Sequence, residues 1–96
     1  MELRAGQLVF SQAGRDQGQA YLIWRLIDNR FVEVVDGYRR RVERPKRKNV
    51  RHVRPTSQTA LTVAQKLERG EPVSNAEVRK AIDQLGAGKG GGPRDG

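Results

Sequence analysis

The residues with the clearest capacity for chemistry are cations gathered in one short segment of the chain. Residues 38–54 hold nine of the 19 Lys and Arg residues but a single acid, Glu43. This segment carries as much positive charge as the whole 96-residue chain, whose formal net charge is +8, so the remaining residues are neutral as a set. A polyanion relieves the repulsion among such charges, and nucleic acid is the polyanion that small basic proteins most commonly meet. The segment predicts contact with nucleic acid. The alternative is a solvated loop that binds other molecules non-specifically.

The arginines of this segment suit phosphate better than the lysines do. A guanidinium holds an oxyanion with two donors, whereas an ammonium acts as a point charge. If residues 38–42 form a strand, Arg39 and Arg41 share one face and Arg40 lies on the other. Residues 46–48 follow a proline, so we expect them to be exposed in a loop. We expect the segment as a whole to present one surface to the anion.

Two rings in the segment are candidates for contact with a base. Tyr38 adjoins the arginines and is the best candidate for stacking, while His52 could stack or donate to phosphate. An ordinary surface histidine is the more common explanation of His52, and Trp24 is more naturally a core or helix-packing residue. The candidate nucleic-acid-binding residues are Arg15, Tyr38, Arg39, Arg40, Arg41, Arg44, Lys46, Arg47, Lys48, Arg51, His52 and Arg54.

A loop between Gly14 and Gly18 supplies the candidate that lies outside the basic segment, Arg15. Glycine adds no side-chain bulk, so a nucleic-acid backbone can come close to this loop. We expect Arg15 to contact phosphate, with Asp16 orienting its guanidinium. In the alternative, Asp16 bonds its own loop and Arg15 is solvated.

The other polar residues form no catalytic or metal-binding set. Cysteine is absent, which excludes disulfides and thiolate sites. The one histidine has no acid beside it in sequence, and Asp28, Glu33 and Asp36 do not make an acid–base pair. The sequence therefore favours a binding protein over an enzyme, with no cofactor.

Short runs of β-branched and aromatic residues predict that the first half of the chain is a sheet. Asp36-Gly37 is a strong hairpin signal, because glycine accepts the positive φ that such turns require. Five short strands with tight turns favour a small, strongly bent antiparallel barrel, which would leave no edge exposed. The expected strands are residues 7–12, 19–27, 31–35, 38–42 and 49–53.

The period of the apolar residues changes in the second half, where residues 59–86 favour a helical hairpin. An apolar face over residues 60–67 predicts a first helix that ends at Gly70. Ser74 and Glu77 match a capping box, so a second helix starts near residue 75 and stops by Gly86. We expect these helices to pack on each other or on the sheet, because neither is long enough to be stable alone.

These patterns divide the chain into a barrel at residues 1–56, a helical hairpin at 57–86 and a disordered glycine-rich tail at 87–96. No run of about 18 apolar residues is present, so we expect no membrane-spanning helix. The first residues lack the pattern of a secretory signal. These features, with the absence of cysteine, fit the cytoplasm.

The order of several short motifs resembles that of a known family. The motifs are the glycines at positions 6, 14 and 18, then Gly14-Arg15-Asp16, Asp36-Gly37 and Pro45-Lys46-Arg47-Lys48-Asn49. Over residues 1–54 this set resembles the small bacterial KOW-domain RNA-binding proteins. These are similar to a KOW-containing large-subunit ribosomal protein family of archaea and eukaryotes.

The resemblance implies an SH3-like barrel and RNA binding, with ribosomal RNA as the expected partner and ribosomal or transcription proteins as further ones. The helical hairpin departs from the bare motif and receives no function from it. A second hypothesis takes the hairpin as a docking surface for a protein, so that the chain would be an adaptor of the transcription or translation machinery.

Overall fold

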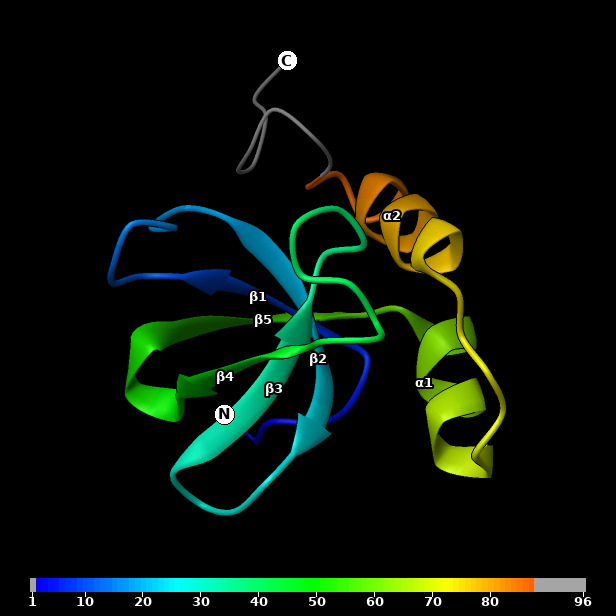
Figure 1. The fold of residues 1–96 in the computed structure, drawn as a ribbon, viewed down its shortest axis with the longest axis horizontal. Coiled ribbons are helices and arrows are strands. Elements are labelled where there is room, and N and C mark those ends of the chain that lie inside the picture. The colour runs from blue at the N-terminus through cyan, green and yellow to red at the C-terminus, as the bar shows by residue number, and fades with distance from the viewer. Residues whose placement is uncertain (1, 88–96) are drawn as a thin grey trace.

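The computed structural model describes residues 2–87, which form five strands, a short 3₁₀ helix and two α-helices (Figure 1). In chain order the elements are β1 (Gln7–Ser11), β2 (Ala20–Leu26), β3 (Phe31–Val35), β4 (Lys46–Asn49), η1 (Val50–His52), β5 (Val53–Thr59), α1 (Leu61–Arg69) and α2 (Asn75–Gln84). No helix among these residues is both long and apolar enough to cross a membrane.

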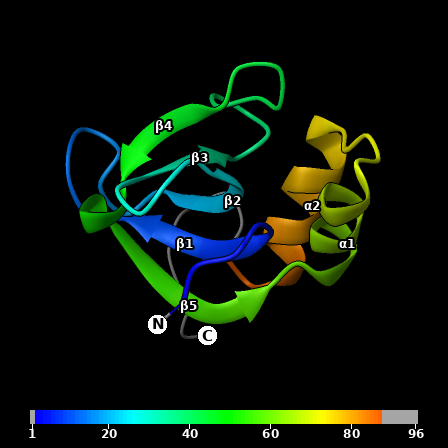
Figure 2. The ribbon, with the colours of Figure 1, turned by 90° about the horizontal axis from the view of Figure 1, so that it is seen from below.

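The strands form one antiparallel sheet in the order β4-β3-β2-β1-β5, as expected for a β-rich fold of five strands. The sheet is curved, but it does not close, since within residues 2–87 no ladder joins the edge strands β4 and β5 (Figure 2). The short helix η1 carries the chain between the two edges. Its backbone bonds elsewhere: Val50 donates to the carbonyl of Arg30, and Gln12 donates to the carbonyl of His52.

The sheet divides the apolar core into two clusters, one on each face. Leu8, Leu22 and Val35 are paired across three strands and meet Val78 and Ile82 of α2 on the same side. The helices therefore cover this face, as Figure 2 shows, and the helical hairpin shares a core with the strands. Trp24 packs against this cluster, as its sequence context predicts. The opposite, concave face holds the second cluster, which is made of Val9, Tyr21, Ile23, Val32, Val34 and Val53.

Residues 38–42 are not a strand, and this prediction was wrong. The Oδ1 atom of Asp36 accepts the backbone N–H groups of Tyr38 and Arg40, each at 2.9 Å. These donors are satisfied locally, so the segment has less need of a neighbouring strand. The chain turns again at residues 42–44 and returns as β4, which takes the place beside β3.

The prediction of a strand at residues 49–53 was also wrong, because Asn49 caps η1. Its Oδ1 accepts the N–H of Arg51 at 2.9 Å, and β5 begins only at Val53. The helical predictions are confirmed: α1 ends at Gly70, and the capping box at Ser74 opens α2. The expected disordered tail at 87–96 lies outside the described residues except for Ala87.

Candidate nucleic-acid interface

Four predicted site residues line one open hollow of about 740 Å³, which we call the basic groove. The groove lies between the loop joining β1 to β2, the turn after β3 and the start of β4. Its cations are Arg15, Arg39, Arg40 and Lys46. The other residues that line it are Asp16, Gln17, Gly18, Gln19, Tyr21 and Asp36.

Asp16 forms hydrogen bonds and ion pairs with several polar side chains at the base of this groove. Its carboxylate accepts the hydroxyl of Tyr21 at 2.6 Å and that of Ser11 at 2.8 Å, and it pairs with Lys46 and Lys48 at 3.3 and 3.2 Å. Burial raises the pKa of Asp16, but the hydrogen bonds from these four groups outweigh it, so the pKa lies well below its usual range. Asp16 therefore stays ionised and neutralises cations from a strand far away in sequence.

The hydroxyl of Tyr21 is buried beside charged groups of the groove, and both conditions affect its pKa. Burial raises the pKa of its hydroxyl, and the bond to Asp16 and the charge of Asp36 raise it further, while the charge of Arg40 opposes them. The net shift is upward, so this hydroxyl stays protonated and keeps donating to Asp16.

The lysines of β4 point inward because of the register of that strand. Lys46 and Lys48 pair with Val34 and Val32, whose side chains belong to the concave cluster. Lys48 is only 7% exposed, so the expectation that residues 46–48 form an exposed loop was wrong. Alternation along a strand places Arg47 on the opposite face.

The turn after β3 brings Arg39 and Arg40 to the same groove, although opposite faces were expected. That expectation depended on a strand, whereas Asp36 folds these residues into a turn. Asp36 is 3% exposed, and its second oxygen accepts the side-chain amide of Gln19 at 3.1 Å. This acid therefore shapes the backbone of the turn and anchors it to the start of β2.

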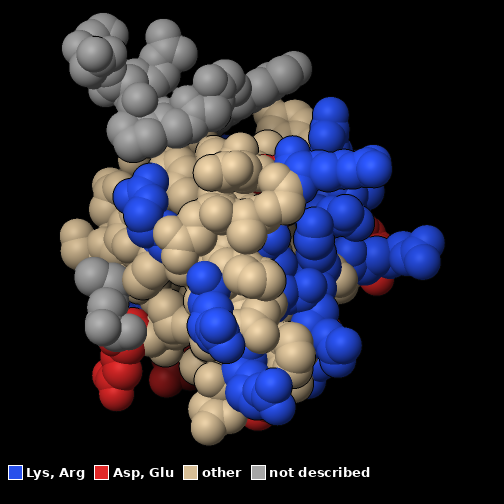
Figure 3. Space-filling view, turned by 90° about the vertical axis from the view of Figure 1, so that its left-hand side faces the viewer, with Lys and Arg blue, Asp and Glu red and all other residues tan. Residues whose placement is uncertain are grey.

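Arg15, Arg39 and Arg40 are the exposed cations of the groove. In residues 2–87 their side chains make no ion pair or hydrogen bond. Asp16 accepts hydrogen bonds from Ser11 and Tyr21 and does not orient Arg15. On the face seen in Figure 3, Lys and Arg side chains gather in a band along one side, with few acidic side chains showing. The groove thus offers guanidinium groups to an external anion.

The remaining candidates lie outside the lining of the groove. Lys48 is bound to Asp16 beneath it, and Tyr38, which is 46% exposed, lies in the turn that presents Arg39. Arg41 pairs with Glu43 at 3.7 Å, and both side chains are exposed.

Two further arginines lie over aromatic rings of the sheet. The guanidinium of Arg47 is 4.7 Å from the ring centre of Phe31, and that of Arg54 is 5.0 Å from that of Phe10. Arg44 is exposed in the turn before β4, and Arg51 and His52 are exposed on η1. Of the basic segment, Arg39, Arg40 and Lys46 line the groove, whereas Lys48 and Arg41 are paired with acids.

Sequence reasoning missed Gln19, Tyr21 and Asp36 as parts of the site. Asp36 had a signal, since the Asp-Gly dipeptide marked it as a turn residue. No sequence signal marked Tyr21 or Gln19, because their hydrogen bonds to Asp16 and Asp36 form only in the folded protein.

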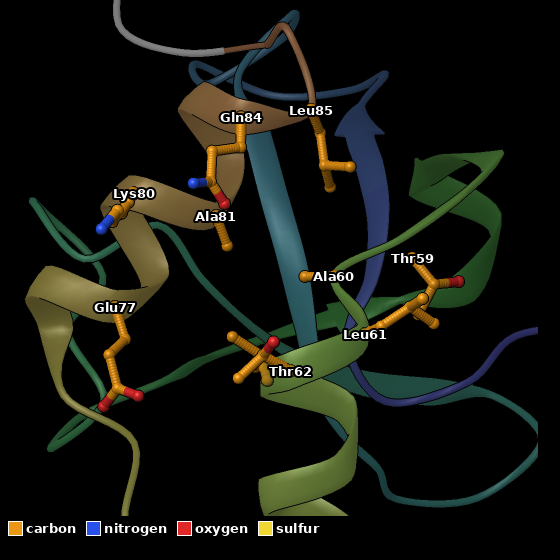
Figure 4. Close-up of a pocket in the computed structure, with 10 residues that line it drawn as sticks. Thr59, Ala60, Leu61, Thr62, Glu77, Lys80, Ala81, Gln84 and Leu85 are labelled. Atoms are coloured by element: carbon orange, nitrogen blue, oxygen red, sulfur yellow. The ribbon is translucent and has the colours of Figure 1, made fainter.

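A second hollow, of about 480 Å³, lies between the two α-helices. Figure 4 shows Ala81 of α2 and Leu85, which follows this helix, facing Ala60, which precedes α1, and Thr62 in its first turn. None of the predicted RNA-binding residues lines it.

No protein-family model matches this chain. Within residues 2–87 no group of three or more histidines and acids is placed to hold a metal ion. The interpretation of the site therefore depends on its own geometry and charge.

Proposed function

We propose that this protein binds RNA and holds its phosphate backbone in the basic groove. The observation that carries the proposal is the set of three exposed arginines without acidic partners in the described chain, Arg15, Arg39 and Arg40, which line one groove from two separate loops. Guanidinium groups bind phosphate with paired donors, and structured RNA is recognised largely by shape and backbone. Arginines on two loops can span successive phosphates of a folded strand.

The resemblance to KOW-domain proteins supports RNA as the polyanion and ribosomal RNA as its class. It also favours an SH3-like relationship for the curved sheet, although the ladder between the edge strands stays open. Arg15 and Asp16 of the motif Gly14-Arg15-Asp16, which belongs to that resemblance, line the groove. A ribosome-associated role would place the protein in the cytoplasm.

The test is filter binding of a ribosomal RNA fragment across a series of salt concentrations. Affinity should fall steeply with salt, because bound phosphates release their counterions. The double variant Arg39→Gln/Arg40→Gln should bind more weakly and reduce the salt slope by about two, one unit for each lost phosphate contact.

A control separates the groove from general charge. The double variant Arg69→Gln/Lys80→Gln removes the same charge from exposed positions on the helices. It should bind RNA nearly as the parent does. A shallow slope in the parent, or equal losses in the helix control, would refute the proposal, and an adaptor that binds only proteins would give the first of these results.

A further inference from the structure

The second α-helix holds both ends of the segment that carries the groove arginines. The Nη1 atom of Arg79 donates to the carbonyl of Gly37 at 2.8 Å, just before Tyr38. The Oδ1 atom of Asn75 accepts the N–H of Val42 at 2.8 Å, just after Arg41. Asn75 and Arg79 are four residues apart on α2, so they project from one side of the helix. The four residues 38–41 lie between these two attachments.

These attachments are tight and largely shielded from water. A Cβ atom placed on Gly37 would lie 2.6 Å from the carbonyl oxygen of Asn75, so the turn and the helix are in direct backbone contact. Asn75 is 7% exposed, and its Nδ2 also donates to the carboxylate of Glu43 at 2.9 and 3.3 Å. The bond from Asn75 is the main reason why the pKa of Glu43 is lowered. The guanidinium of Arg79 lies 5.3 Å from the ring centre of Tyr38.

The bonds fix the backbone of this segment and leave two of its guanidinium groups for a ligand. Asp36 binds the N–H groups of Tyr38 and Arg40 from within the turn, while α2 binds its two ends. In the described part of the chain neither Arg39 nor Arg40 pairs with an acid. An unattached loop would have to be ordered at the moment of binding, and that ordering would weaken affinity.

We propose that α2 is a positioning element of the RNA site, in which Asn75 and Arg79 set the turn so that Arg39 and Arg40 face the groove. This inference rests on the proposed function, and it gives the helical hairpin a role that the KOW resemblance does not supply. Asn75 and Arg79 act through the turn and not by touching RNA.

The first experiment loosens the turn at Asn75 without changing the net charge. Asn75→Ala should keep its fold, exchange the amide hydrogen of Val42 faster in the absence of RNA, and bind the ribosomal RNA fragment about tenfold more weakly. The double variant Asn75→Asp/Glu43→Gln exchanges the two partners: the new carboxylate at position 75 accepts from Val42 and from the new side-chain amide at position 43. This charge-neutral variant should restore both slow exchange and affinity.

A second pair of variants covers the case in which Asn75→Ala fails to fold. Arg79→Ala should weaken RNA binding about fivefold, whereas Lys80→Ala, which removes the same charge from the exposed neighbouring position, should change it less than about twofold. Thermal unfolding of all the variants measures any general loss of structure.

The outcomes distinguish this inference from the proposed function. Faster exchange at Val42 with unchanged RNA affinity would overturn the inference and leave RNA binding intact. Equal losses for Arg79→Ala and Lys80→Ala would also overturn it, because charge alone would then explain both. A parent protein that binds no RNA would refute the proposed function, and the inference would fall with it.

Discussion

Two neighbouring pairs of cations differ in whether an acid neutralises them: Lys46 with Lys48, and Arg39 with Arg40. The lysines lie on a strand, face the concave core and share the carboxylate of Asp16. The arginines lie on a turn, and in residues 2–87 no acid pairs with them. The difference shows that one dense run of basic residues can hold both cations that are paired inside the fold and cations that are left unpaired; only the unpaired ones enter the proposed RNA site.

The two acids of the groove account for this difference. Asp16 directs its oxygens to side chains and cancels charge, whereas Asp36 directs one oxygen to two backbone N–H groups and shapes a turn. An acid that bonds the backbone orders the chain without pairing the arginines beside it. The comparison therefore predicts that loss of Asp16 affects stability, and that disturbance of the turn affects binding as well.

The largest expected effect is on stability in Asp16→Asn. This change leaves Lys48, whose side chain is 7% exposed, without its counter-charge, and should lower the free energy of unfolding by about 3 kcal/mol. Urea unfolding measures it, and RNA affinity of the folded variant should be retained. Asp83→Asn, at an exposed position on α2, is the control and should change stability by less than about 0.5 kcal/mol. An equally small change in Asp16→Asn would show that the network contributes little.

The same carboxylate should make stability depend on acidity. The pKa of Asp16 is lowered in the folded protein, so its stabilising effect is complete above the pKa of the unfolded chain, at about pH 4, and is lost as the pH falls further. The parent should therefore lose more stability than Asp16→Asn when urea unfolding is repeated between about pH 5 and pH 2. Glu43 and Glu77, whose pKa values are also lowered, act in both proteins and cancel in the difference. Parallel pH curves for the two proteins would contradict this assignment.

A smaller loss, about 2 kcal/mol, is expected for Gly37→Ala. The φ of Gly37 is +79°, and a Cβ there would meet the Asn75 carbonyl, so the turn must move away from α2. Gly70→Ala is a matched control, because its φ is +73° but no atom lies within 4 Å of the added carbon. The control should cost about 1 kcal/mol and keep RNA affinity, whereas Gly37→Ala should lose both stability and affinity. Equal losses in the two variants would show that only backbone strain matters at Gly37.

Features set by nearby residues could be predicted from the sequence. The capping box at Ser74, the end of α1 at Gly70 and the first three strands depend on spacings within a few residues, and the structure confirms them. The turn at Asp36-Gly37 was also predicted, but the strand expected after it was not formed. Residues 38–42 can either bond to the side chain of Asp36 as a turn or pair with β3 as a strand, and sequence patterns do not decide between these two structures.

The division of the basic segment could not be predicted either. Proline at position 45 indicated a loop, yet β4 starts directly after it and turns Lys48 inward. Asp16 is 32 residues away from Lys48, and only the tertiary structure brings them together. The attachment of the turn by Asn75 and Arg79 left no sequence signal for the same reason.

The alternation of Lys46, Arg47 and Lys48 has a consequence for how the edge of the sheet assembles. A slip of β4 by one residue against β3 would exchange the two faces of the strand. It would carry the Arg47 guanidinium to the inner face and move both ammonium groups into solvent, so that the carboxylate of Asp16 would face one cation of this strand in place of two. Misaligned pairings of this edge are thus penalised electrostatically as well as by packing, although β4 spans only four residues.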